Sequence, residues 1–147
     1  MKLSPAAHDE VESFLKGHLG DSGLRLPRFS VHVGWPARLL MKVVRMGAIT
    51  FGRHVFISPR LVERDESGRA RLPGWLLVHE AAHVLQYRER GFAGFLYFYL
   101  RGYWRALRAG HGWGAEARML AYLSIPHERE ARRAEHAYVE EKLRRAV

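Results

Sequence analysis

The residues best suited to chemistry in this sequence are His79-Glu80-Ala81-Ala82-His83, two histidines with a glutamate directly after the first. In a helix, residues i and i+4 stand one turn apart on one face, so two such imidazoles can reach one Zn²⁺ ion without backbone strain. The glutamate lies next to that face, where it can hydrogen-bond a water on the metal and take its proton. The spacing therefore predicts a metal site suited to hydrolysis.

The surroundings of this motif favour a metal site over a plain histidine pair. Residues 76–78 and 84–85 on either side are apolar, which predicts a buried helix. A charged glutamate between two histidines is costly there unless it is paired or metal-bound. The alternative is a hydrogen-bonded pair of core histidines without metal. Gln86, one turn after His83, either lines the site or caps a buried backbone group.

A catalytic zinc site needs a third protein ligand, and the last predicted helix, residues 127–145, offers glutamates for that role. On a helical wheel Glu128 falls within the apolar arc, Glu130 points away from it, and Glu135 faces inward two turns deeper. The wheel favours Glu128, with Glu130 and Glu135 as alternatives. A purely structural role for Glu128 would be to complement the helix dipole from the first turn.

These residues together resemble the gluzincins, zinc metallopeptidases in which HExxH supplies two ligands and a glutamate on a later helix supplies the third. The sequence HEAAHVLQYRERG, followed by an aromatic helix and PHEREARR, is similar to the minimal single-domain gluzincins of bacteria and archaea over roughly residues 50–137. The resemblance implies a zinc peptidase in which His79, His83 and Glu128 bind Zn²⁺ and Glu80 acts as the general base.

The resemblance also has implications for the residues around the metal. Arg132 stands where larger gluzincins often carry an aspartate that orients a zinc-bound histidine, so this support must come from elsewhere. Residues 48–52 are placed like the edge strand to which such peptidases add an extended peptide, the alternative being plain sheet structure. Gluzincins stabilise the oxyanion with Tyr or His from the helical part, for which Tyr122 is the first choice and His111 the second.

An α+β fold is expected to position these residues, with a small antiparallel sheet or hairpin followed by a mostly helical zincin-like core, as one domain over residues 1–147. The elements expected in the first half are a helix from Ser4 to Gly20, a strand over 28–35, a short helix over 36–46, a hairpin of 48–51 with 54–58, and a loop over 59–73.

The second half of the sequence is predicted to be helical. Residues 74–90 form a buried helix that carries the HExxH motif, Gly91 breaks it, and residues 92–109 form a second helix. Phe92 is expected on the apolar face of that second helix. A short helix over 115–123 precedes the final one.

Composition excludes several classes of protein. The 147 residues include no Cys, which rules out a disulfide scaffold, thiolate metal sites and thiol catalysis. The chain carries 24 Lys and Arg against 15 Asp and Glu, a formal net charge of +9. We find neither a signal peptide nor an apolar run long enough for a bilayer, which predicts a cytoplasmic protein.

The positive charge is concentrated in two stretches without acidic residues, 22–62 and 90–115. The second stretch contains three arginines on one face of an aromatic-rich helix: Arg101, Arg105 and Arg108. The simplest interpretation is a solvated outer face. An anionic membrane surface is an alternative, while nucleic acid has no recognition motif in its favour. The first stretch would steer acidic substrates toward a nearby cleft.

The main hypothesis is a zinc-dependent metallohydrolase, above all a peptidase that acts on peptide or protein substrates. A second hypothesis, from a different class, is a catalytically degenerate, zinc-stabilised scaffold or binding module. The third is a metal-free basic module that docks on a membrane or on nucleic acid. Metal content, peptide cleavage and salt-dependent binding distinguish the three.

Overall fold

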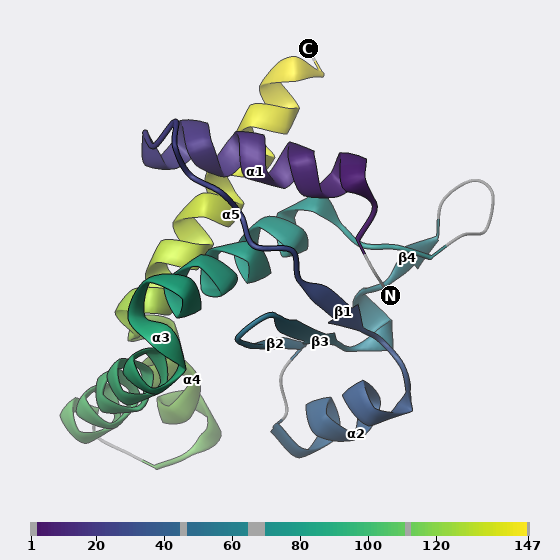
Figure 1. Cartoon of the computed structure of the whole chain (residues 1–147). Helices are drawn as coiled ribbons and strands as arrows, with labels where there is room; N and C mark the ends of the chain where they lie inside the picture. Colours follow the sequence, from purple (N-terminus) through teal and green to yellow (C-terminus); the bar gives the residue numbers. More distant parts are fainter. Residues whose placement is uncertain (1–2, 45–46, 65–69, 111–112, 147) are drawn as a thin grey trace.

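The computed structural model describes residues 3–44, 47–64, 70–110 and 113–146 of the chain. Over these residues the protein is α+β, as predicted, and the long helix α3 contacts α1, α4, α5 and strand β2 (Figure 1). The elements are α1 (Pro5–Leu19), β1 (Ser30–His32), α2 (Trp35–Val44), β2 (Ala48–Phe51), β3 (His54–Ile57), a 3-10 turn η1 (Pro59–Leu61), β4 (Glu63–Arg64), β5 (Ala70–Arg71), α3 (Gly74–Ala109), α4 (Ala115–Ser124) and α5 (Pro126–Arg145).

Helix α1 begins and ends where its sequence predicts. The Ser4 side chain accepts a hydrogen bond of 3.2 Å from the backbone N–H of Ala7, and Pro5 occupies the first turn, where no N–H is needed. Gly20 ends the helix in the left-handed conformation, with φ of 66°. The buried face of the helix carries Val11 and Leu15 into the core.

The three-stranded sheet has the order β1-β3-β2, so β2 is an edge strand. The predicted hairpin is present: β2 and β3 are antiparallel and turn at Gly52, whose φ is 59°. The expected all-antiparallel sheet needs correction, because β1 pairs with β3 in parallel. Helix α2 lies between β1 and β2 in the chain, and the tight turn then reverses β3 so that it runs in the direction of β1.

Two segments of the first half differ from the sequence-based expectation. The strand predicted over residues 28–35 is confined to Ser30–His32, because the chain enters α2 at Trp35 with Pro36 in the first helical turn, where a missing N–H is harmless. The loop predicted over 59–73 contains the turn η1 and, within the described residues, the short antiparallel pair β4–β5.

Helix α3 is two helices joined at a bend. Gly91 has φ of 69° and ψ of 167°, values outside the helical region, so the predicted break at this residue is confirmed. The half before the bend is buried almost all round, and its Val78 and Val84 pack with Val31, Val55 and the rest of the core. Phe92, predicted to face inward, is 55% exposed because it lies directly after the bend.

Helix α5 packs along α3 through small side chains. Ala131 and Ala134 are buried, which lets the two helices approach closely. Further along α5, the Tyr138 ring lies so near Gly74 that an added Cβ at this glycine would be 2.4 Å from the hydroxyl. That hydroxyl donates a hydrogen bond of 2.7 Å to Glu10, which joins α5 to α1. None of the helices in the described parts of the chain is long and apolar enough to cross a membrane.

Candidate metal centre

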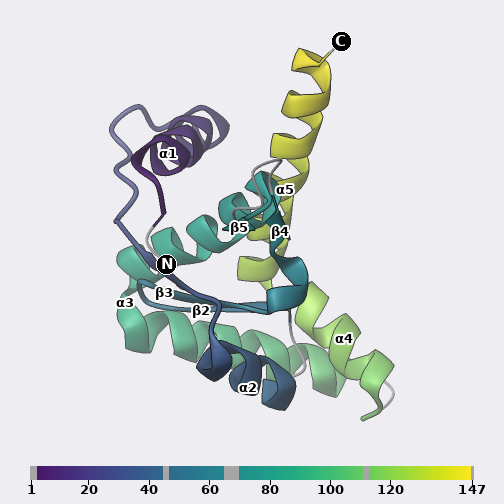
Figure 2. The same cartoon turned by 90° about the vertical axis from the view of Figure 1, so that its right-hand side faces the viewer.

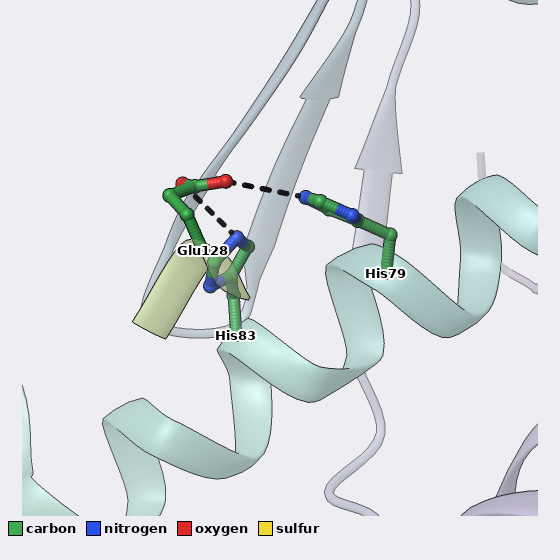
Figure 3. Close-up of side chains that lie close together, drawn as sticks. All are labelled: His79, His83 and Glu128. Carbon is green, nitrogen blue, oxygen red and sulfur yellow. Dashed lines mark ion pairs between the residues drawn. The ribbon is translucent and has the colours of Figure 1, made fainter. Parts of the chain in front are cut away.

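His79 and His83 stand one turn apart on the buried half of α3, as the HExxH spacing requires. Their rings lie 5.0 Å apart between centroids and are nearly perpendicular, at 78°. Only 8% of His79 and 6% of His83 is exposed, so both imidazoles are held by packing on all sides. The local helical geometry thus presents two ring nitrogens, both Nε2 atoms, toward the start of α5 (Figure 3).

Glu128, in the first turn of α5, brings its carboxylate to these two nitrogens. Oε2 lies 3.6 Å from Nε2 of His79 and Oε1 lies 3.4 Å from Nε2 of His83 (Figure 3). Donor atoms from the three residues all lie within 4.8 Å of one another. The helical wheel favoured this glutamate, and the structure brings it together with the motif. Two imidazoles and one carboxylate form a donor set that could hold a metal ion.

The second nitrogen of each imidazole has a polar partner. Nδ1 of His79 lies 2.9 Å from Oε2 of Glu135, and Nδ1 of His83 lies 2.8 Å from Oε1 of Gln86. Because both partners are acceptors, the neutral form of each imidazole carries its proton on Nδ1, which leaves the lone pair of Nε2 to a metal. Glu135, an alternative candidate for the third ligand, instead supplies the histidine support that Arg132 cannot give.

Gln86 is itself held in place by the beginning of α5. Its amide nitrogen donates hydrogen bonds of 3.1 Å to the backbone oxygen of His127 and to Oε2 of Glu130. This fixes the orientation of the Gln86 amide, so its oxygen must face His83. Glu130, the other alternative ligand, is exposed and binds Gln86, and it is not among the residues whose donor atoms converge. Gln86 thus caps a buried backbone group, one of the two roles left open by the sequence, and its amide oxygen also supports His83.

One oxygen of the Glu128 carboxylate has no hydrogen bond in the part of the chain that the structure describes, which favours a cation as its partner. Oε1 of Glu128 accepts a hydrogen bond of 2.9 Å from the hydroxyl of Tyr99, but Oε2 is buried without a hydrogen-bond partner among the described residues. The ion pair of this oxygen with Nε2 of His79, at 3.6 Å, is longer than a hydrogen bond, and a cation between the carboxylate and the two imidazoles would give the oxygen a close partner. The residues present therefore form a donor set that fits a metal ion.

The protonation of the metal-free cluster follows from the same contacts. Burial disfavours the imidazolium of His79, but the carboxylates of Glu128 and Glu135 outweigh it and raise the pKa of His79 to about 9. Burial likewise opposes ionisation of Glu128, but His79 and His83 hold its pKa below the usual range. Without metal, the cluster is thus a set of buried charge pairs, and a metal ion must displace protons from it.

Glu80 lies in the same buried region, facing the sheet. It is 3% exposed, and its Oε2 accepts a hydrogen bond of 2.6 Å from the hydroxyl of Thr50 on the edge strand β2. Glu80, both histidines and Glu128 line one cavity of about 120 Å³. The remaining lining residues come from β2, α3 and α4: Ala48, Ile49, Thr50, Phe51, Tyr87, Phe95, Leu96, Tyr99 and Tyr122.

Two tyrosines reach the carboxylate side of this cavity. Tyr122, the sequence-based candidate for oxyanion stabilisation, lies there on α4, and burial with the neighbouring Glu128 carboxylate raises its pKa well above the ordinary value. The same causes raise the pKa of Tyr99, to which the sequence assigned no part in the site. Both phenols therefore stay protonated and can donate hydrogen bonds. The second candidate, His111, lies outside the described residues.

Comparison with known proteins gives one match. A family model described as the eCIS core domain, from extracellular contractile injection systems, matches residues 6–91, more than half of the chain. The matched part runs from α1 to the bend in α3 and contains the HExxH motif, but it ends before Glu128. A search of curated proteins and a search of solved structures found no match. The likeness to gluzincins stays a prediction.

Proposed function

The chain belongs to the eCIS core domain family, and we propose that it is a zinc-dependent metallohydrolase that cleaves peptides. The observation that carries the proposal is the convergence of His79, His83 and Glu128 on one point beside Glu80. Each imidazole is supported at Nδ1, and one Glu128 oxygen has no other partner. A core that needed only hydrogen-bonded histidines would bring that oxygen within hydrogen-bond distance of Nε2 of His79, from which it lies 3.6 Å away.

The edge strand supports a peptide as the substrate. All four residues of β2 line the cavity, and β2 pairs with β3 on one side only. Its outer edge can therefore hydrogen-bond an extended peptide by strand addition. Because residues 22–62, which include β2, contain no acidic side chain, acidic peptides are the favoured class.

Different residues of the cavity are assigned to different steps of hydrolysis. Bound Zn²⁺ would polarise the scissile carbonyl and lower the pKa of a water molecule toward neutrality. Glu80 is the group placed to accept a proton from an attacking water molecule and to return it to the leaving amine. The protonated hydroxyl of Tyr122 is the donor assigned to the developing oxyanion. Tyr99 holds Oε1 of Glu128 and so orients the third ligand.

The decisive test joins metal analysis to peptide cleavage. Protein never exposed to chelator should contain one Zn²⁺ per chain, and a library of acidic peptides should be cleaved. Glu80→Gln should keep the zinc and lose about 10²–10⁴-fold in cleavage rate, since it removes the general base. Glu89→Gln, at an exposed position of the same helix, is the matched control and should retain activity. Absence of zinc, or full activity in Glu80→Gln, would contradict the proposal.

A second candidate function is a metal-stabilised structural module of a contractile injection system. The family name favours it, and so does the Thr50 hydrogen bond, which occupies the Glu80 carboxylate in a buried position. Under this alternative, chelation lowers the melting temperature, no peptide in the library is cleaved, and Glu80→Gln leaves the zinc content unchanged. The same cleavage and metal measurements therefore separate the two candidates.

A further inference from the structure

One end of the molecule exposes many large apolar side chains. Helix α2, the half of α3 after the bend and helix α4 all lie at the end away from the C-terminus, in both views (Figures 1 and 2). We call the exposed surface of these three elements the aromatic–basic end. Large apolar residues here, each at least 43% exposed, are Trp35 and Leu39 on α2, Phe92, Tyr97, Phe98, Leu100 and Trp104 on α3, Met119 and Leu120 on α4, and Trp113 just before α4, which we include in this end.

The outer face of α3 mixes these side chains with arginines in a regular way. Tyr97, Arg101, Trp104 and Arg108 follow one another at steps of four, three and four residues, so they share one helix face. The opposite face of this half is buried through residues such as Phe95. The Trp104 ring lies 6.2 Å from that of Trp113, which extends the aromatic surface toward α4.

The charged residues of the aromatic–basic end are almost all basic. Helix α2 and residues 90–115 contain no acidic residue, and α4 contains only Glu116. Arg101, Arg105 and Arg108 surround Trp104 in an open depression of about 600 Å³. None of the three forms an ion pair with an acidic group in the part of the chain that the structure describes. Three guanidinium groups are thus free to bind an anionic partner.

We propose that the aromatic–basic end docks the protein on an anionic phospholipid bilayer. Guanidinium groups bind lipid phosphates, and Trp and Tyr are the side chains that settle at the boundary between headgroups and acyl chains. The exposed aliphatic residues, such as Leu39 and Leu120, distinguish lipid from nucleic acid, since they gain from burial among acyl chains but neither stack on bases nor bind phosphate. Docking is peripheral and independent of the metal centre.

Vesicle flotation tests this proposal directly. The protein should float with vesicles of phosphatidylcholine and phosphatidylserine and remain behind with phosphatidylcholine alone, and added salt should weaken the binding. Three of the four tryptophans are exposed, at 76% for Trp35, 68% for Trp113 and 48% for Trp104. Binding should therefore shift the tryptophan emission to shorter wavelength as these indoles leave water.

Two matched triple substitutions test whether vesicle binding depends on this surface or only on the net charge of the protein. Arg101→Gln, Arg105→Gln and Arg108→Gln together should lower the affinity for anionic vesicles on the order of a hundredfold, at about fivefold per arginine. The control triple is Arg133→Gln, Arg144→Gln and Arg145→Gln, exposed positions of α5 toward the opposite end with the same change in charge. It should lower the affinity much less. Trp104→Ala with Trp113→Ala should weaken binding without any change in charge.

Four results would overturn the proposal: no preference for anionic vesicles, equal effects of the two arginine triples, tighter binding to a DNA duplex than to vesicles, or self-association that the arginine triple on α3 abolishes. Melting temperatures of all variants show whether they are folded. The substituted arginines are exposed on the helix surface, so we expect the fold to persist.

Discussion

At the scale of single residues, the metal centre depends on support from one turn further along α5 than the resemblance to gluzincins would place it. Arg132 cannot accept a hydrogen bond from a histidine, and Glu135 accepts one from Nδ1 of His79 instead. Arg132 still contributes to the electrostatics of this pair. The hydrogen bond with His79 lowers the pKa of Glu135 most, and the positive charge of Arg132 lowers it further. The acceptor for His79 therefore comes from position 135 of this helix and not from position 132.

Glu135→Gln tests this support. The amide can still bind Nδ1 of His79 but no longer provides the negative charge that strengthens the imidazole as a ligand, so zinc affinity should fall about 10–100-fold. Competition with a chromophoric chelator measures the change. Glu140→Gln, at an exposed position of the same helix, is the control and should bind zinc like the unmodified protein. If all three proteins bound zinc with equal affinity, Glu135 would have no role in supporting His79 as a ligand.

Zinc binding should also release protons. The two carboxylates beside His79 raise its pKa to about 9, so below that pH the metal-free site holds a proton that Zn²⁺ must displace. Apparent affinity should therefore rise as the pH increases toward about 9. Titration calorimetry at about pH 7.5, in two buffers with different ionisation enthalpies, gives the number of protons released. Binding heats that are identical in both buffers would contradict this expectation.

At the scale of elements, the bend at Gly91 allows one helix to serve two purposes. The half of α3 before it carries the histidines, and the half after it turns so that Tyr99 reaches Glu128. The backbone angles at Gly91 are accessible to glycine and costly for other residues. The bend is therefore part of the construction of the site.

Gly91→Ala should destabilise the protein by about 1–3 kcal/mol, because alanine is strained at this positive φ. Gly17→Ala is a control for which we expect the opposite effect on the free energy of unfolding. Gly17 lies within α1 with nothing within 4 Å of an added Cβ, so alanine there should stabilise by about 0.5–1 kcal/mol. Urea unfolding of the three proteins gives both values. If the two substitutions changed the free energy of unfolding equally, alanine would not be strained at the bend.

At the scale of the whole molecule, carboxylates join the N-terminal helix to the rest of the fold. Glu12 accepts hydrogen bonds from Lys16, at 2.7 Å, and from the backbone N–H of Leu26, at 2.9 Å. Together these bonds lower the pKa of Glu12 to about 2. Since the pKa is lower in the folded state than in the unfolded chain, the ionised group stabilises the fold above about pH 4.5, and this stability is lost as the pH falls toward 2.

Glu12→Gln should consequently lower the free energy of unfolding most at neutral pH. The difference from the unmodified protein should shrink between about pH 5 and about pH 2, where Glu12 becomes protonated in both states. Urea unfolding across this range measures it. Asp9→Asn, at the exposed neighbouring carboxylate, is the matched control. A difference that stays constant across the range would contradict the expected role of Glu12.

The sequence alone determined the features that depend on local backbone geometry. The HExxH spacing places two histidines on one helix face, Ser4 and Gly20 delimit α1, and Gly91 breaks α3, because each involves residues within a turn or two of one another. Periodicity also selected Glu128 over Glu130, since a wheel separates inward from outward positions.

Only the tertiary structure decided which partners meet across elements. Thr50 and Glu80 are 30 residues apart and Tyr99 and Glu128 are 29 apart, so neither hydrogen bond has a local signal. The choice of Glu135 as histidine support depends on how deeply α5 packs on α3, and the parallel pairing of β1 with β3 depends on the path of α2 between them. Such contacts result from packing all elements at once, which the local pattern of a single segment does not contain.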